Sequence, residues 1–89
     1  MKTRITEKTK NGNWTSGTVK LANGRTFRFQ VKSFDEPSEF GIDGGRVSKL
    51  WVVTATRLVT AVNYDRGWDV KPQTSDHKAV YAALLKRYN

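Results

Sequence analysis

The strongest constraint on the fold of this chain is an alternation of apolar and polar residues in segment 27–32. Bulky apolar side chains are separated there by polar and basic ones, in the order Phe27, Arg28, Phe29, Gln30, Val31 and Lys32. Successive side chains of a β-strand point to opposite faces of the sheet, so this pattern predicts a strand with one apolar and one polar face.

A hairpin joins this strand to a preceding one at residues 14–21. The connection Ala22-Asn23-Gly24 allows two registers. A two-residue turn would pair Phe27 with Lys20, whereas a three-residue loop with Gly24 in the left-handed conformation pairs Val19 with Phe27. We predict the second register, which also pairs Thr15 with Val31, because it gives the hairpin one apolar face. The opposite face then carries Lys20, Arg28, Gln30 and Lys32, either as a solvated surface or as a platform for phosphates.

The rest of the chain predicts two more strands and a helix. Segments 47–54 and 58–64 are apolar on both faces, as in strands that are covered on both sides. A helix capped by Thr74 or Ser75 presents a stripe at helical spacing, formed by Val80, Tyr81, Leu84, Leu85 and Tyr88. We therefore predict an α+β fold: a four-stranded antiparallel meander with one C-terminal helix packed on one face, in the order ββββα.

The apolar residues on the remaining face of this sheet, Trp51, Val53 and Val59, predict a homodimer or protein interface. The alternative is that the N-terminal arm or the acidic loop covers them. We expect residues 1–12 to form a basic, flexible arm and residues 13–89 to form a single domain. The longest apolar run, 50–53, is far too short to span a bilayer, and the chain has no cysteine, so we expect a soluble cytoplasmic protein.

The charge balance favours a polyanionic partner. Sixteen Lys and Arg against eight Asp and Glu give a formal net charge of +8 in 89 residues. Such an excess produces a positive potential that attracts nucleic acids and nucleotides, although it carries no sequence recognition.

Enzymatic chemistry finds little support. His77 is the single histidine, and a nucleophile such as Ser48 has no base at a suitable spacing. The glutamates come before the glycines in segment 35–45, the reverse of a calcium loop. We therefore predict a non-enzymatic binding protein with no catalytic residues, cofactor or metal.

Two loops carry the residues most suited to binding a phosphate. The glycine-rich segment 41–45 leads to Arg46 and Lys49, and segment 64–69 contains Arg66 and Trp68. No phosphate-loop template fits the glycines, which we interpret as shaping a strand connection. We predict that Arg46, Lys49, Arg66 and Trp68 converge on a ligand, supported by Arg28 and Lys32. Stacking surfaces for bases are expected at Trp14, Tyr64 and Trp68.

These loops also carry a resemblance. The pattern Glu39-Phe40-Gly41-Ile42 through Gly45-Arg46-Val47-Ser48-Lys49-Leu50, followed by Tyr64-Asp65-Arg66-Gly67-Trp68-Asp69, resembles a family of short bacterial and phage proteins of unknown function. The resemblance spans about residues 14–72. It implies a phage or mobile-element context, hence the cytoplasm of a bacterial host, and supplies no catalytic residues.

Two functions follow as hypotheses. The first is binding of nucleic acid or a nucleotide through the basic and aromatic loop residues. The alternative is an inhibitor of a host defence system, or an accessory factor, acting by protein contact through Trp51, Val53 and Val59 or through the acidic loop.

Overall fold

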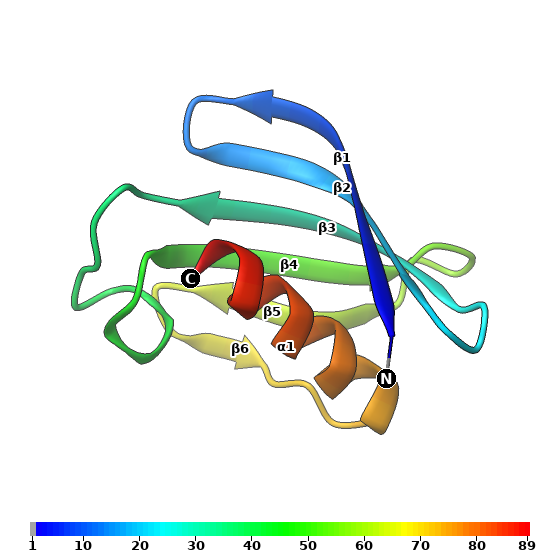
Figure 1. Ribbon diagram of the computed structural model, residues 1–89. Coiled ribbons are helices and arrows are strands. Elements are labelled where there is room, and N and C mark those ends of the chain that lie inside the picture. The colour runs from blue at the N-terminus through cyan, green and yellow to red at the C-terminus, as the bar shows by residue number, and fades with distance from the viewer. Residues whose placement is uncertain (1) are drawn as a thin grey trace.

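The computed structural model describes residues 2–89 as one antiparallel sheet with a helix across one face (Figure 1). The six strands are neighbours in chain order: β1 (Thr3–Asn11), β2 (Trp14–Leu21), β3 (Thr26–Ser33), β4 (Val47–Thr54), β5 (Thr60–Asp65) and β6 (Trp68–Val70). A short 3-10 turn, η1 (Ile42–Gly44), lies between β3 and β4, and α1 (Ser75–Tyr88) ends the chain. The α+β class and the C-terminal helix are as predicted, but the sheet has six strands instead of four.

The largest difference from expectation lies at the N-terminus. In place of a free arm over residues 1–12, residues 3–11 form β1, which pairs along β2 with Ile5 opposite Val19. Residue 1 lies outside the described part of the chain. The sequence signal was weak because only Ile5 is aliphatic in this segment. The strand forms because the edge of β2 offers a complete row of backbone partners.

The other unpredicted strand is β6, which is only three residues long and pairs Trp68 with Tyr64. Two residues separate β5 from β6, and this tight turn leaves too short a segment for the alternation of a strand to be recognised. β6 forms the second edge of the sheet.

The predicted register of the β2–β3 hairpin is confirmed. Val19 lies opposite Phe27 and Thr15 opposite Val31. Gly24 has a φ of 90°, in the left-handed region, and its N–H donates to the carbonyl of Leu21 at 3.0 Å. The hairpin therefore presents one apolar face to the core, as the alternation requires.

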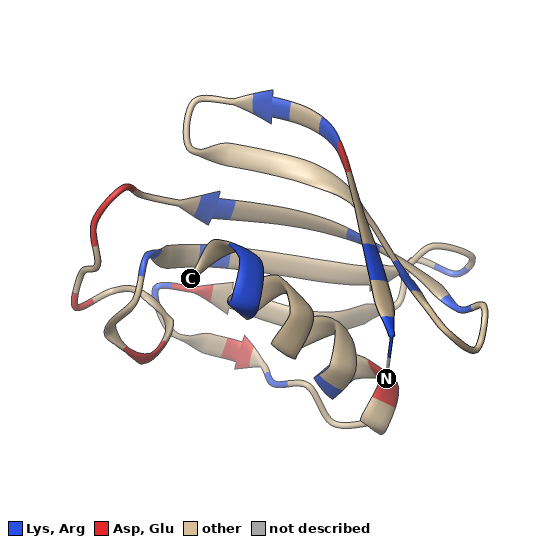
Figure 2. Ribbon diagram, in the orientation of Figure 1, with Lys and Arg blue, Asp and Glu red and all other residues tan. Residues whose placement is uncertain are grey.

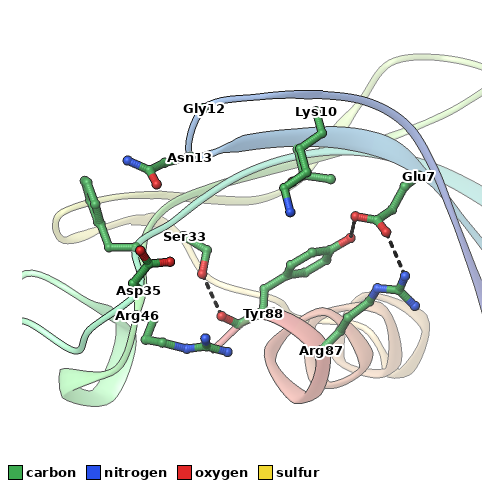
Figure 3. Close-up of a pocket in the computed structure, with 11 residues that line it drawn as sticks. Glu7, Lys10, Gly12, Asn13, Ser33, Asp35, Arg46, Arg87 and Tyr88 are labelled. Atoms are coloured by element: carbon green, nitrogen blue, oxygen red, sulfur yellow. Dashed lines mark hydrogen bonds and ion pairs between the residues drawn. The ribbon is translucent and has the colours of Figure 1, made fainter.

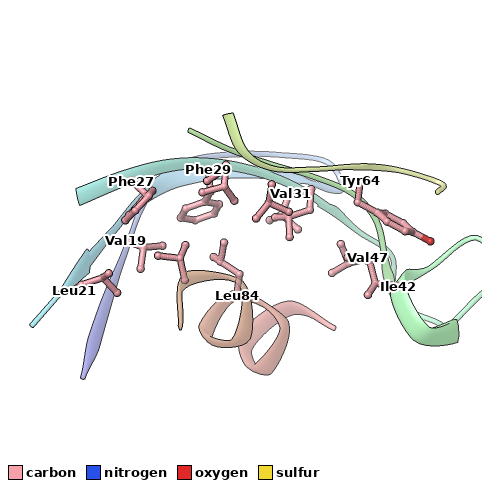
Figure 4. Packing of buried hydrophobic residues seen from close by; sticks show 14 residues of the cluster. Val19, Leu21, Phe27, Phe29, Val31, Ile42, Val47, Tyr64 and Leu84 are labelled. Carbon is pink, nitrogen blue, oxygen red and sulfur yellow. The ribbon is translucent and has the colours of Figure 1, made fainter. Parts of the chain in front are cut away.

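The core fills the space between this face and α1 (Figure 4). The helix begins where the Thr74 hydroxyl accepts the N–H of His77 at 3.1 Å, a typical N-cap. Val80 and Leu84 are 0% and 1% exposed and pack against the sheet. Burying each such side chain stabilises the fold by about 1.5–3 kcal/mol, so the helix is held mainly by its contact with the sheet.

Among the described residues, α1 is too short and too polar to cross a membrane, and no other helix of sufficient length is present.

Candidate nucleic-acid interface

The C-terminal end of α1 packs against the glycine-rich loop. The side chain of Asn89 accepts the N–H of Val47 at 2.9 Å and donates to the carbonyl of Ile42 at 3.1 Å. A Cβ atom placed on Gly45 would lie 2.4–2.6 Å from the side-chain atoms of Asn89. A side chain at this position would therefore displace the Asn89 side chain from the loop, which agrees with the interpretation that the loop shapes a connection.

Arg46 belongs to the same docking arrangement. Its Nε donates to the main-chain oxygen of Asn89 at 3.4 Å, and the residue is half-buried. A cation at the C-terminal end of a helix is favourable because the last carbonyls there are unpaired and partly negative. Part of the hydrogen-bonding capacity of Arg46 is thus used within the fold.

The second loop is a tight turn between β5 and β6. Arg66 has a φ of 55° and its N–H donates to the carbonyl of Ser48 at 2.9 Å. Trp68 lies on the helix side of the sheet, edge-on to Tyr64 at 5.1 Å between ring centroids and 5.5 Å from Tyr81. It covers the margin of the core, so the stacking role expected of Tyr64 and Trp68 competes with their packing.

The four loop residues do not all converge, although Lys49 and Arg66 both lie near Asp65, with nitrogens 3.6 and 3.9 Å from its carboxylate. Arg46 lies at the end of α1, Arg66 in an exposed turn and Trp68 on the helix side. Lys49 lies on the opposite face of the sheet, directly across from Lys32 in the β3–β4 ladder. Arg28 and Lys32 share that face, which we call the open face because α1 does not cover it.

The open face is strongly basic. The register of the sheet places six cationic side chains on it: Arg4, Lys8, Lys20, Arg28, Lys32 and Lys49. Acidic side chains gather elsewhere, chiefly in the loop after β3 and around the β5–β6 turn (Figure 2). Asp65 is the acidic residue closest to the basic row, with an oxygen 3.6 Å from Nζ of Lys49.

Two tryptophans project from this basic face. Trp14 on β2 and Trp51 on β4 are each 39% exposed, although both are large apolar side chains. Gln30 on β3 lies between them, opposite Trp51 in the ladder, and Lys32 lies opposite Trp14. The strand spacing and the offset of two residues put the Cα atoms of the two tryptophans about 12 Å apart. Nζ of Lys32 is 5.9 Å from the centre of the Trp14 ring, a cation–π geometry that steadies both side chains.

Shallow hollows connect these side chains. One, of about 550 Å³, is bordered by Trp14, Gln30, Lys49 and Trp51. A second, of about 460 Å³, extends from Gln30 and Trp51 toward Arg28 and the β4–β5 loop. Gln30 borders both, and its side-chain amide makes no hydrogen bond to any described residue. The open face thus offers aromatic, amide and cationic groups side by side.

The predicted protein interface is only partly exposed. Val53 is 1% exposed and cannot provide contact area. Trp51 is exposed, but as part of the basic face. Val59 is 54% exposed at the β4–β5 loop beside Leu58, which is 57% exposed. The expectation that Trp51, Val53 and Val59 form one apolar patch therefore does not hold.

Reasoning from sequence did not predict that Trp14 and Trp51 share one face of the sheet. The signal was present, because the predicted register already placed Lys20, Arg28, Gln30 and Lys32 on one face. Extending that register by one strand, to 47–54, brings Trp51 beside Gln30. The β3–β4 pairing joins segments that are far apart in the chain, so local patterns do not show which residue of 47–54 lies opposite Gln30.

The described residues hold little that suggests covalent chemistry. His77 packs edge-on against Phe27 at 5.8 Å, and the buried hydroxyl of Ser48 has no hydrogen-bond partner among them. No three His, Cys, Asp or Glu side chains in this part of the chain are grouped so that they could hold a metal ion.

Comparison with known proteins gives one match. Residues 13–89 match a family described as a domain of unknown function (DUF7678), and the chain belongs to that family. No curated protein and no solved structure matches it significantly. The match begins at Asn13, in the turn between β1 and β2, so β1 precedes the part of the chain that the family covers.

Proposed function

We propose that this protein binds single-stranded nucleic acid on the open face of its sheet and has no catalytic role. The observation that carries the proposal is the position of Trp14 and Trp51, two exposed indoles on a face that also bears six cationic side chains. Aromatic side chains that accept stacked bases, set among cations that contact phosphates, are how many domains hold single strands.

Single strands fit this face better than a duplex. The bases of a duplex are stacked on each other and unavailable to an indole, and the major groove admits a helix or a two-stranded ribbon, not a flat sheet. A single strand can instead turn its bases toward the protein. The separation of about 12 Å between the Cα atoms of the two tryptophans leaves room for a base on each, with Gln30 between them.

The cations beside the indoles can contact the phosphates of a single strand whose bases face the sheet. Lys32 and Lys49 lie opposite each other on β3 and β4, and Arg28 lies on the other side of Gln30 along β3, opposite Val53. Each phosphate that they neutralise releases a counterion, which gives affinity that falls as salt rises. Lys49 also faces Asp65, so we expect Arg28 and Lys32 to contribute more.

A direct test is fluorescence anisotropy with a labelled 15-mer single strand and with a duplex of the same sequence at low salt. We expect tighter binding to the single strand. Trp14→Ala and Trp51→Ala should each weaken it about tenfold, since a stacked base contributes about 1–3 kcal/mol. Trp68→Ala is the matched control, because Trp68 lies on the other side of the sheet.

Circular dichroism must show that each variant is folded at the temperature of the assay. Equal affinity for duplex and single strand, or a loss on Trp68→Ala as large as on Trp14→Ala, would contradict the proposal. If neither oligonucleotide binds at low salt, the proposal is wrong.

A second candidate is protein contact, which the exposed Leu58 and Val59 favour. These residues lie at one end of the open face, where Leu58 borders the hollow that contains Trp51. Binding that depends on Leu58 and is insensitive to salt would support this function instead, because apolar contact is not screened.

A further inference from the structure

A cleft of about 610 Å³ lies between the β1–β2 hairpin, the start of the loop after β3 and the C-terminal end of α1 (Figure 3). It is on the helix side of the sheet, away from the open face. Three cations, Lys10, Arg46 and Arg87, border it together with the carboxylates of Glu7 and Asp35. Its volume is in the range of about 300–1,000 Å³ that small-molecule sites occupy.

Glu7 is already matched by partners within the fold. It accepts hydrogen bonds from the Arg87 guanidinium at 2.8 Å and from the Tyr88 hydroxyl at 3.0 Å. These donors hold the pKa of Glu7 below its ordinary value. The charge of Glu7 and that of Arg87 therefore cancel, and this pair neither attracts nor strongly repels an anion.

The main-chain oxygens at the C-terminal end of α1 also have hydrogen-bond partners within the fold. The carbonyl of Tyr88 accepts the hydroxyl of Ser33 at 2.7 Å, and the main-chain oxygen of Asn89 accepts Nε of Arg46 at 3.4 Å. The negative end of the helix dipole is thus screened from the cleft by donors. The other nitrogens of the Arg46 guanidinium make no hydrogen bond to any described residue.

Lys10 adds a further positive charge to the cleft, and this charge also helps to lower the pKa of Glu7. Its ammonium projects into the cleft toward Tyr88 and forms no ion pair with any described residue (Figure 3). A bulge between Glu7 and Thr9 determines this direction, since it lets Lys8 face the open side while Lys10 faces the helix side. Bulges commonly redirect a side chain in this way.

We propose that the cleft binds the phosphate group of a small phosphomonoester, with Lys10 and Arg46 as the cationic donors and Asn13 as a neutral one. After Glu7 and Arg87 cancel, Lys10 and Arg46 outnumber the remaining carboxylate, Asp35. Ammonium and guanidinium groups form the strongest hydrogen bonds that proteins make to phosphate. The proposal does not rest on the function assigned to the open face, because the two surfaces share no residue.

NMR titration of the full chain tests it, with inorganic phosphate, adenosine 5′-monophosphate and adenosine as probes. We expect both phosphate compounds to shift the amide signals of Lys10, Asn13 and Ser33, and adenosine to leave them unchanged. Equal affinity for inorganic phosphate and adenosine 5′-monophosphate would show that the phosphate group alone is sufficient for binding. Tighter binding of the nucleotide would identify a nucleotide site. No shift with either at millimolar concentration, or equal shifts with adenosine, would overturn the proposal.

Charge variants give a test of sign as well as size. Lys10→Gln should weaken phosphate binding about tenfold, since a hydrogen bond to a charged group contributes about 1.5–3 kcal/mol. Asp35→Asn should strengthen it by removing a repelling carboxylate. Lys8→Gln removes the same charge from the same strand on the opposite face and should leave phosphate binding in the cleft unchanged. If Lys8→Gln weakens binding as much as Lys10→Gln does, the effect is one of net charge, and the proposed site is wrong.

The double variant Trp14→Ala and Trp51→Ala separates the two proposals. It should keep phosphate binding in the cleft whether or not it binds an oligonucleotide. Loss of phosphate binding in this variant, with the fold intact, would place the phosphate on the open face instead.

Discussion

Asn89 and Gly45 are in direct contact where the end of α1 meets the loop before β4. The side-chain amide of Asn89 bridges Val47 and Ile42, and it occupies the space that a side chain at position 45 would need. The contact joins the last residue of the described chain to a loop more than forty positions earlier. It explains a glycine that could otherwise be taken for part of a ligand site.

Gly45→Ala should therefore destabilise the protein. The new methyl group would displace the Asn89 side chain and break its two hydrogen bonds, at a cost of about 1–3 kcal/mol. Chemical denaturation measures this change. Gly67→Ala is the matched control, since no atom lies within 4 Å of a Cβ placed there, and it should be neutral or slightly stabilising. If the two variants unfold at the same denaturant concentration, the proposed contact is unimportant.

The ion pair between Glu7 and Arg87 should make stability depend on acid pH. The pKa of Glu7 is lower in the folded state than its ordinary value of 4.5, chiefly through hydrogen bonds from Arg87 and Tyr88. The stabilisation is therefore present above pH 4.5 and is lost as the pH falls below it. Because Glu7 is partly exposed, we expect less than about 1 kcal/mol.

Glu7→Gln should flatten this dependence, measured as the midpoint of thermal unfolding between pH 3 and pH 6 (roughly the range over which glutamate titrates). Glu39→Gln, in the exposed loop, is a suitable control. A wild-type profile that Glu7→Gln leaves unaltered would show that the pair contributes nothing.

Tyr88 should produce a corresponding loss of stability at alkaline pH. Burial and the hydrogen bond to Glu7 raise its pKa from 10.0 to about 12. The folded state retains the phenol proton at a pH where the unfolded chain has released it, so stability falls as the pH rises from about 10 toward 12. Tyr88→Phe should reduce that fall. The tyrosinate absorbance of the folded wild-type protein should show a late-titrating phenol that the variant lacks.

The salt dependence of oligonucleotide binding should report single phosphate contacts on the open face. For a single strand, the slope of log affinity against log salt changes by about 0.7 for each phosphate contacted. Lys32→Gln should reduce the slope by about this amount, and Lys78→Gln, an equal change of charge on the exposed side of α1, should leave it unaltered. Equal slopes for the two variants would count against a localised phosphate contact at Lys32.

Local patterns were sufficient to predict much of the fold. The alternation at 27–32 and the three-residue connection determined the β2–β3 register, because only one register keeps the apolar side chains on one face. The strand at 47–54 and the cap at Thr74 were likewise readable from neighbouring residues. β1 and β6 were not, since an edge strand needs little apolar patterning and takes its stability from the strand beside it.

The candidate sites depended on long-range packing to a greater degree. The sequence correctly indicated basic and aromatic residues as the chemically interesting groups, but it joined those that are close in the chain, such as Arg66 and Trp68. In the structure Trp68 packs on Tyr81, and Trp51 lies on the same face as Trp14, a residue thirty-seven positions earlier. Side-chain neighbours on a sheet are set by strand order and register, which local spacing does not encode.

By itself, the sequence determined the charge of the protein, the apolar face of its central hairpin and the helix that covers that face. These properties follow from composition and from the short periods of strands and helices. Only the tertiary structure decided that Asn89 packs against the glycine loop, that the N-terminal segment forms the edge strand β1, and which cations share a surface. Each of those outcomes depends on contacts between segments far apart in the chain, where the bulges at Glu7 and Ser33 determine which way each side chain points.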